Sequence, residues 1–156
     1  MAREAQIKAG RYQRILEQLR SELSKSGDPV ARMATVASLL HHRQPHFFWT
    51  GFYRLLDGQL VVGPYQGSLA CQNIEVGKGV CGTAFERGET IVVPDVHEFP
   101  GHIPCDARSR SEIVVPYRDA DGVLAGVLDV DSTEPAAFDA VDAENLEQIV
   151  ALLPPG

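Results

Sequence analysis

Two Asp-Gly dipeptides, each set between runs of apolar and β-branched residues, constrain the fold of this chain most strongly. They are Asp57-Gly58 and Asp121-Gly122. Asp-Gly favours two-residue turns with positive φ, which connect neighbouring antiparallel strands. The sequence therefore predicts two β-hairpins in the middle of the chain. Their strands are expected at residues 46–53, 60–62, 113–117 and 123–128.

Helical patterns surround this region. Apolar residues recur on one side from Ile7 to Leu23, and a second stripe follows Asp28-Pro29, an N-cap with proline at the first helical position. Asp139 or Asp142 caps a last helix, and a short helix is expected within residues 77–88. Antiparallel hairpins between terminal helices predict an α+β fold, in which a central antiparallel sheet is covered on one face by the N- and C-terminal helices.

The composition is that of one globular domain, with 156 residues, 44% of them hydrophobic. The net charge of −7 argues against nucleic acid or an anionic membrane as a partner, since either requires a basic face. The sequence contains no apolar run of about 20 residues and no apolar segment of a signal peptide at its start. We therefore predict a cytoplasmic protein whose cysteines are reduced and able to react.

Three cysteines, Cys71, Cys81 and Cys105, lie beside glycine-rich or polar segments. Cys105 follows a proline within residues 101–112, a polar stretch without helical or strand periodicity that is typical of a surface loop. Free cysteines are usually small buried hydrophobes. Three of them in loop-like settings therefore indicate thiol chemistry.

Two kinds of site, one for a dinucleotide and one for zinc, compete with this interpretation. Gly77, Gly79 and Gly82 have nearly the spacing of a dinucleotide-binding fingerprint, but that fingerprint requires a parallel βαβ unit, which the hairpins do not provide. A zinc site could combine the cysteines with His97 or His102, but the separations are irregular and include no Cys-x-x-Cys pair. We expect neither a cofactor nor a metal.

A series of motifs resembles the GAF domains and, among them, the free methionine-(R)-sulfoxide reductases, from about Phe48 to the C-terminal helix. The motifs are Gly63-Pro64-Tyr65-Gln66-Gly67, Ala70-Cys71, Gly79-Val80-Cys81-Gly82-Thr83-Ala84, Asp95-Val96-His97, Gly101-His102-Ile103-Pro104-Cys105-Asp106, Ser111-Glu112-Ile113-Val114-Val115-Pro116 and Leu128-Asp129-Val130-Asp131-Ser132. The resemblance implies a small-ligand pocket on the sheet face opposite the terminal helices. It also divides the chain into an N-terminal helix, residues 1–27, and a GAF-like catalytic domain, residues 28–156.

The resemblance implies thiol-dependent reduction of free L-methionine-(R)-sulfoxide to methionine. Cys105 is then the nucleophile that becomes a sulfenic acid, and Cys71 is the preferred resolving thiol that forms an intramolecular disulfide with it. Cys81 is an alternative resolving thiol or an auxiliary. Thioredoxin is the implied reductant, and a homodimer is among the alternatives for the oligomeric state.

The substrate-binding residues implied by the resemblance are two aromatic and three acidic side chains. Trp49 and Tyr53 share a face of their strand and would form a wall around the methyl sulfoxide group. Asp129 and Asp131, also on one face, would join Glu112 in holding the substrate ammonium and supplying a proton. The competing function is that of a non-catalytic GAF sensor, which binds a metabolite and needs no reactive cysteine.

Overall fold

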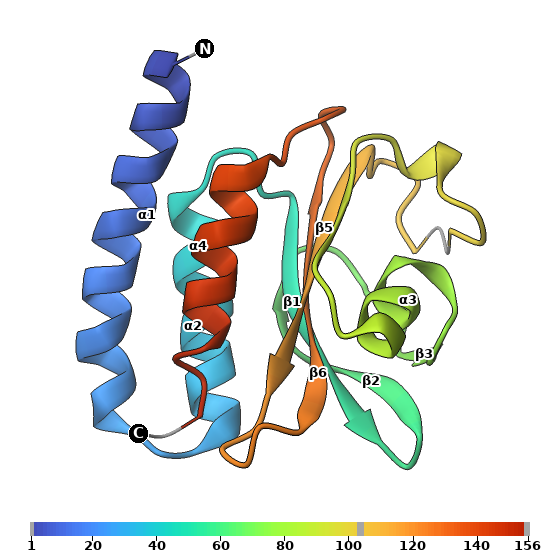
Figure 1. The fold of residues 1–156 in the computed structure, drawn as a ribbon, viewed down its shortest axis with the longest axis horizontal. Helices are drawn as coiled ribbons and strands as arrows, with labels where there is room; N and C mark the ends of the chain where they lie inside the picture. The colour runs from blue at the N-terminus through green and yellow to red at the C-terminus, as the bar shows by residue number, and fades with distance from the viewer. Residues whose placement is uncertain (1, 103–104, 155–156) are drawn as a thin grey trace.

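The computed structural model describes residues 2–102 and 105–154 (Figure 1). The helices are α1 (Ala2–Glu22), α2 (Pro29–Arg43), α3 (Gly79–Arg87) and α4 (Ala140–Val150), with 3-10 turns η1 (Leu23–Lys25) and η2 (Val96–Glu98). The strands are β1 (Trp49–Leu56), β2 (Gln59–Gln66), β3 (Asn73–Glu75), β4 (Ile91–Val93), β5 (Ser111–Arg118) and β6 (Leu124–Ser132). None of the helices in the described part of the chain has the length and apolar character that a membrane span requires.

The strands form one antiparallel sheet in the order β3-β2-β1-β6-β5-β4. Both predicted hairpins are confirmed. Asp57 and Gly58 have φ values of 51° and 78° and join β1 to β2, as expected for a turn with two left-handed residues. The second hairpin joins β5 to β6 around Gly122, where the side chain of Asp119 accepts hydrogen bonds from two backbone N–H groups of the turn.

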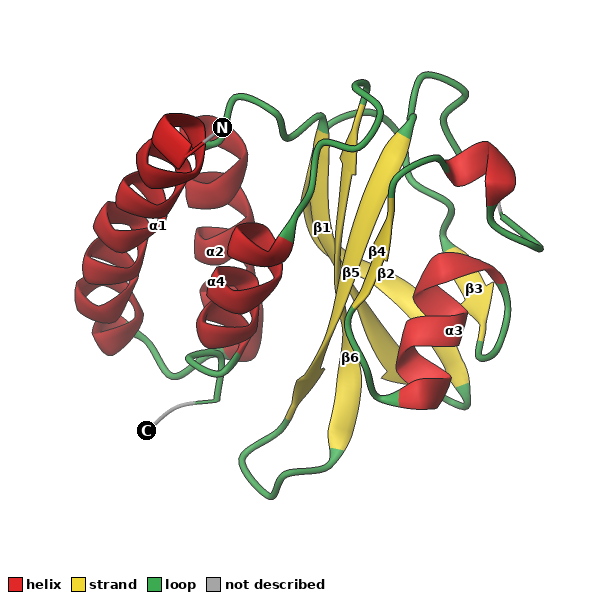
Figure 2. Ribbon diagram, turned by 45° about the horizontal axis from the view of Figure 1, so that its top comes forward, coloured by secondary structure: helices red, strands yellow, loops and turns green. Residues whose placement is uncertain are grey.

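Helices α1, α2 and α4 cover one face of the sheet, and α3 lies on the opposite face with the longer connecting segments (Figure 2). This arrangement confirms the predicted α+β fold. The Asp28 side chain caps α2 through the backbone N–H of Ala31, at 2.9 Å, as expected from the sequence. Of the two candidates for the α4 cap, Asp139 is the N-cap, and Asp142 completes a reciprocal capping box.

Each face of the sheet has its own apolar core. The core under the terminal helices contains Tyr12, Ile15, Leu16, Leu19, Leu40, Phe52, Ile113, Leu128, Leu146 and Ile149, among others. The core on the α3 face contains Trp49, Tyr53, Leu60, Ile74, Val80, Cys81, Ala84, Val96, Val114 and Val127, among others. Residues alternate between the two faces along each strand. The sheet therefore separates a helical support from the face that holds the candidate site.

Candidate functional site

The register of the sheet gathers the acidic side chains on the α3 face. Glu112 on β5 lies directly opposite Asp131 on β6, and Asp131 lies opposite Trp49 on β1. Asp129 is two residues along β6 and so projects from the same face. We call Glu112, Asp129 and Asp131 the acidic trio. The β5–β6 hairpin and the distant strand β1 thus contribute to one row of polar and aromatic groups.

The acidic trio lines a small pocket with a volume of about 50 Å³. All three predicted classes of side chain meet there, since the aromatic residues, the carboxylates and two of the cysteines line the same space. The lining residues are Trp49, Tyr53, Leu69, Ala70, Ile74, Lys78, Gly79, Val80, Cys81, His102, Cys105, Asp106, Ser109, Glu112, Asp129 and Asp131.

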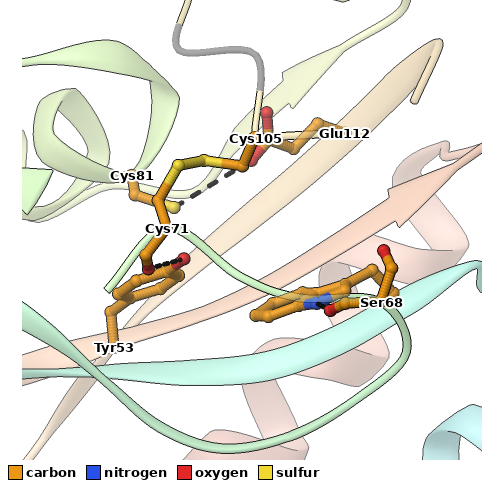
Figure 3. The surroundings of a disulfide bond; sticks show 7 residues. Tyr53, Ser68, Cys71, Cys81, Cys105 and Glu112 are labelled. Atoms are coloured by element: carbon orange, nitrogen blue, oxygen red, sulfur yellow. Dashed lines mark hydrogen bonds between the residues drawn. A yellow bond between two sulfur atoms is a disulfide. The ribbon is translucent and has the colours of Figure 1, made fainter. Parts of the chain in front are cut away.

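Cys71 and Cys105 form a disulfide at the mouth of this pocket (Figure 3). Their Cα atoms are 5.5 Å apart, within the usual range for a disulfide, although 34 positions separate them in the sequence. Cys71 lies in the segment between β2 and β3, and Cys105 lies between η2 and β5. Cys105 is exposed and Cys71 is half-buried. The loop settings predicted for these two residues are confirmed.

Cys81 is different, and the prediction of a loop-like setting for it was wrong. It belongs to the first turn of α3 and is buried, with 4% of its surface exposed. Its Sγ lies 3.9 Å from Oε2 of Glu112, beneath the disulfide (Figure 3). Burial raises the pKa of the Cys81 thiol, and the carboxylates of Asp129 and Glu112 raise it further. Because the thiolate is the nucleophilic form, Cys81 is poorly suited to attack a substrate.

The acidic trio occupies a setting that favours protonated carboxyl groups. Burial raises the pKa of Glu112 and Asp131, and the neighbouring Asp129 raises both further. Burial also raises the pKa of Asp129, partly offset by hydrogen bonds from Glu112 and Cys81. Carboxyl groups this close do not all ionise at neutral pH, so the trio can hold a proton for transfer.

One acceptor atom of the trio has no partner among the described residues. Asp129 is 6% exposed, and its Oδ1 receives no hydrogen bond. A buried carboxylate oxygen without a donor is costly unless a ligand supplies one. The pocket is therefore suited to a ligand that carries an ammonium or another strong donor.

The predicted aromatic wall contains a third ring. Trp49 stacks on Tyr53 with ring centroids 6.1 Å apart and on Tyr65 with centroids 5.2 Å apart. Gly51 makes room for the indole, because a Cβ at that position would lie 2.6 Å from Cη2 of Trp49. Tyr65 lies on β2 opposite Gly51, and only the pairing of β1 with β2 reveals its place in the wall.

The polar ends of these aromatic side chains hold the segment that carries Cys71. Nε1 of Trp49 donates to the carbonyl of Ser68 at 2.9 Å, and the hydroxyl of Tyr53 donates to the carbonyl of Cys71 at 2.9 Å. The bond between Tyr53 and Cys71 is visible in Figure 3. The aromatic wall thus positions the Cys71 segment as well as lining the pocket.

Three side chains of the pocket could together ligate a metal ion. Ligand atoms of Cys81, Glu112 and Asp129 lie within 4.8 Å of one another, and in the described part of the chain these are the residues that could hold a metal ion. The zinc site considered for the sequence combined all three cysteines with a histidine. Cys71 and Cys105 cannot ligate a metal as free thiolates here, because a disulfide joins them. A metal here would need both carboxyl groups and the thiol deprotonated, whereas burial raises the pKa of all three groups.

Comparison with known proteins agrees with this geometry. A model of the GAF domain matches residues 13–153, so the class of protein that the fold and the pocket define is the GAF domain. The match begins inside α1, so it covers more of the chain than the motifs, which begin at about Phe48.

The free methionine-R-sulfoxide reductase of Escherichia coli is 48% identical over 124 residues, covering 80% of this chain and 74% of the relative. The enzyme of the same name from Saccharomyces cerevisiae is 44% identical over 131 residues, covering 80% of this chain and 73% of the relative. The structure of the Neisseria meningitidis free methionine-R-sulfoxide reductase with its substrate has a TM-score of 0.90 at 44% identity, covering 94% of this chain and 87% of that one. The chain belongs to the free methionine-R-sulfoxide reductases of the GAF-domain family.

Proposed function

We propose that this protein reduces free L-methionine-(R)-sulfoxide to L-methionine, with Cys105 as the nucleophile. The observation that carries the proposal is the disulfide between Cys105 and Cys71 at the mouth of a pocket lined by carboxyl groups and aromatic rings. A thiol pair, a proton source and an apolar wall are the parts that sulfoxide reduction needs. The names of the bacterial and yeast relatives support the same reaction.

The chemistry follows from these parts. The Cys105 thiolate attacks the sulfoxide sulfur while a carboxyl group of the acidic trio protonates the oxygen, which gives methionine and a sulfenic acid on Cys105. The Cys71 thiol then attacks that sulfenic acid, forming the disulfide and releasing water. Two electrons pass to the sulfoxide, and an external dithiol, for which thioredoxin is our candidate, restores them by thiol–disulfide exchange.

Substrate recognition is assigned to the other pocket residues. Ionised members of the acidic trio, Asp129 above all because of its free Oδ1, hold the substrate ammonium. Trp49 and Tyr53 contact the methyl group and the polarisable sulfur. Cys81 takes an auxiliary role in this proposal, since its raised pKa disfavours the thiolate.

A homodimeric state and the division of the chain at residue 27 stay predictions.

The test uses separated epimers of free methionine sulfoxide and compares three Cys→Ser variants in single-turnover and multiple-turnover assays. Cys105→Ser should form no methionine with any reductant. Cys71→Ser should yield one equivalent of methionine and then stop with thioredoxin, because sulfenic acid formation needs Cys105 alone. Cys81→Ser is the matched control, since it removes a thiol from the same pocket and should keep both phases.

Two results would reject the proposal. Methionine formation by Cys105→Ser at the wild-type rate would end the assignment of the nucleophile. Binding of methionine sulfoxide by wild-type protein without any conversion would instead favour the alternative of a non-catalytic GAF sensor, for which removal of Cys105 would leave ligand binding intact.

A further inference from the structure

The two segments joined by the disulfide are also joined by a hydrogen bond. Oγ of Ser68 donates to Oδ2 of Asp106 at 2.7 Å. Ser68 precedes Cys71 by three residues, and Asp106 directly follows Cys105. The hydrogen bond therefore joins the same two segments as the disulfide, through side chains that do not themselves change oxidation state.

Asp106 is held firmly on its own side of the gap. Its carboxylate accepts three hydrogen bonds from Arg108: from the backbone N–H at 2.9 Å, from Nε at 3.1 Å and from Nη2 at 2.8 Å. The guanidinium of Arg108 in turn lies 4.8 Å from the centre of the Phe48 ring, next to the start of β1. The hydrogen bonds from Arg108 hold the pKa of Asp106 well below its usual range, so the carboxylate is ionised at neutral pH.

Ser68 is held on the other side by its main chain. Its carbonyl accepts the hydrogen bond from the Trp49 indole, while its hydroxyl is free to reach Asp106. Removal of the hydroxyl would thus cut the link between the segments and leave the backbone contact with Trp49 in place. A substitution of Ser68 can therefore test the hydrogen bond to Asp106 without removing the backbone contact that holds the segment in the pocket.

We propose that Ser68, Asp106 and Arg108 form a positioning device that keeps the Cys71 thiol within reach of the Cys105 sulfenic acid once the disulfide has been reduced. The inference rests on the proposed function and concerns its second step. In that step the Cys71 sulfur bonds to the Cys105 sulfur, the S–O bond of the sulfenic acid breaks, and the hydroxyl leaves as water with the thiol proton. The first step, which produces methionine, does not involve Cys71.

The physical argument is one of effective concentration. Breaking the disulfide frees two loops that lie 34 positions apart, and bringing their ends together again costs entropy. A hydrogen bond to an ionised carboxylate that already joins the loops removes part of this cost and raises the local concentration of one thiol near the other. A longer-lived sulfenic acid would also be exposed to further, irreversible oxidation, so a fast second step protects Cys105.

The test compares wild type with Ser68→Ala, Ser68→Thr and Asp106→Asn, and uses Ser24→Ala as a matched control. Ser24 is an exposed serine on the helical side whose hydroxyl also makes a hydrogen bond, to the Ser21 carbonyl. Reduced protein is mixed with one equivalent of methionine-(R)-sulfoxide. Quenched samples give methionine, and trapping with dimedone followed by mass spectrometry gives the lifetime of the sulfenic acid.

We expect methionine to form at the wild-type rate in Ser68→Ala, while the sulfenic acid decays to the disulfide roughly tenfold more slowly. Ser68→Thr retains a hydroxyl and should restore the fast decay, and Ser24→Ala should match wild type in both phases. Unchanged sulfenic acid decay in Ser68→Ala and Asp106→Asn would overturn the inference. So would an equal slowing of both phases, because it would show a general effect on the pocket.

A second measurement separates this inference from the proposed function. The equilibrium between the Cys71–Cys105 disulfide and a glutathione redox buffer reports the effective concentration of the two thiols without any substrate. Ser68→Ala should lower that effective concentration roughly tenfold, since the hydrogen bond and the disulfide join the same segments and favour each other. If the protein reduced no sulfoxide at all, the proposed function would fail, and this equilibrium would still decide whether the positioning device exists.

Discussion

Three carboxyl groups on the pocket face share a setting that costs stability. Glu112 and Asp129 are each 6% exposed, and burial raises the pKa of every member of the acidic trio. A buried acid with a raised pKa binds a proton more tightly in the folded than in the unfolded state. In the proposed function this cost is offset by use, because the trio supplies a proton and binds the substrate ammonium.

The first prediction concerns stability and pH. For an acid with a raised folded pKa, the folded state holds more protons than the unfolded state above about pH 4, so the free energy of unfolding falls as pH rises through the folded pKa. Glu112→Gln removes this effect and also offers an amide donor near Asp129. We expect the variant to be more stable than wild type at pH 8, by about 1 kcal/mol or more, with the advantage vanishing toward pH 4.

Thermal melting of wild type and Glu112→Gln across this pH range checks the prediction. Glu144→Gln, at an exposed position of α4, makes the same chemical change outside the pocket. A pH-independent difference for Glu112→Gln would show that the carboxyl group does not titrate abnormally. The variant should also lose most of its reductase activity, because it can no longer give up a proton.

The second prediction concerns substrate choice. In the proposed function the ammonium of a free amino acid pairs with the acidic trio, whereas the nitrogen of N-acetyl-methionine-(R)-sulfoxide is neutral and would leave a buried carboxylate without a partner. We expect kcat/KM for the acetylated substrate to be at least about a hundredfold lower in wild type. Asp129→Asn should reduce the ratio of the two kcat/KM values, because it weakens reduction of the free amino acid. Equal kcat/KM values for the two substrates would leave the trio with proton transfer alone.

At the scale of helices and strands, local signals were sufficient to predict most elements. Asp57-Gly58 adopts the left-handed pair of φ values that its residue types favour, and Asp28 and Asp139 cap their helices through their own side chains. The shared face of Asp129 and Asp131 also follows from the two-residue period of a strand. These features depend on interactions within a few residues, which a sequence displays directly.

Other features depend on contacts between distant segments. The pairing of β6 with the distant strand β1 places Asp131 opposite Trp49, and no local pattern predicts that pairing. Tyr65 was overlooked for the same reason. The burial of Cys81 arises because α3 begins at Gly79 and presses its first turn against the acidic trio, whereas the surrounding glycines indicate a loop.

The third prediction concerns the link between α1 and α4. Asp142 on α4 is fully buried and accepts hydrogen bonds from Lys8 at 2.7 Å, Tyr12 at 2.6 Å and His46 at 2.9 Å. Burial alone would raise the pKa of Asp142, but these hydrogen bonds hold it well below its usual range. We expect Asp142→Asn to lower the free energy of unfolding by about 3 kcal/mol at pH 7, since Lys8 loses its buried partner.

The sign of the pH dependence is opposite to that of the trio. An acid whose folded pKa is depressed contributes stability above its unfolded pKa of about 4 and loses it as pH falls through the folded value. The difference between wild type and Asp142→Asn in denaturant titrations should therefore shrink below pH 4. Glu17→Gln, on the exposed side of α1, is the control. A difference that grew in acid would contradict the assignment.

Across the whole molecule, the sheet separates the helices that support it from the pocket on its other face. The terminal helices bury one face of the sheet and include no residue of the pocket, while α3 and the loops cover the other face (Figure 2). Helix α1 lies on the outer side of α2 and α4 (Figure 1) and buries Tyr12, Ile15, Leu16 and Leu19 there. Remote apolar packing thus holds in place a sheet whose opposite face carries the reactive groups.

The fourth prediction uses this arrangement to test the proposed division at residue 27. A chain of residues 28–156 would expose the apolar sides of α2 and α4 and leave Asp142 without Lys8 and Tyr12. We expect it to lose cooperative thermal unfolding, as followed by circular dichroism, and to regain it when a peptide of residues 1–27 is added. A cooperative transition at the wild-type temperature in the truncated chain would show that α1 is dispensable.

The disulfide at the mouth of the pocket has a consequence for the order of events in a catalytic cycle. While the sulfur of Cys105 is bonded to the sulfur of Cys71, it cannot attack a sulfoxide. In the proposed mechanism the oxidised form therefore converts no new substrate molecule until the reductant has opened the disulfide, and methionine should depart before the reductant arrives. Sulfoxide and reductant then react with different forms of the protein, so steady-state kinetics should be ping-pong.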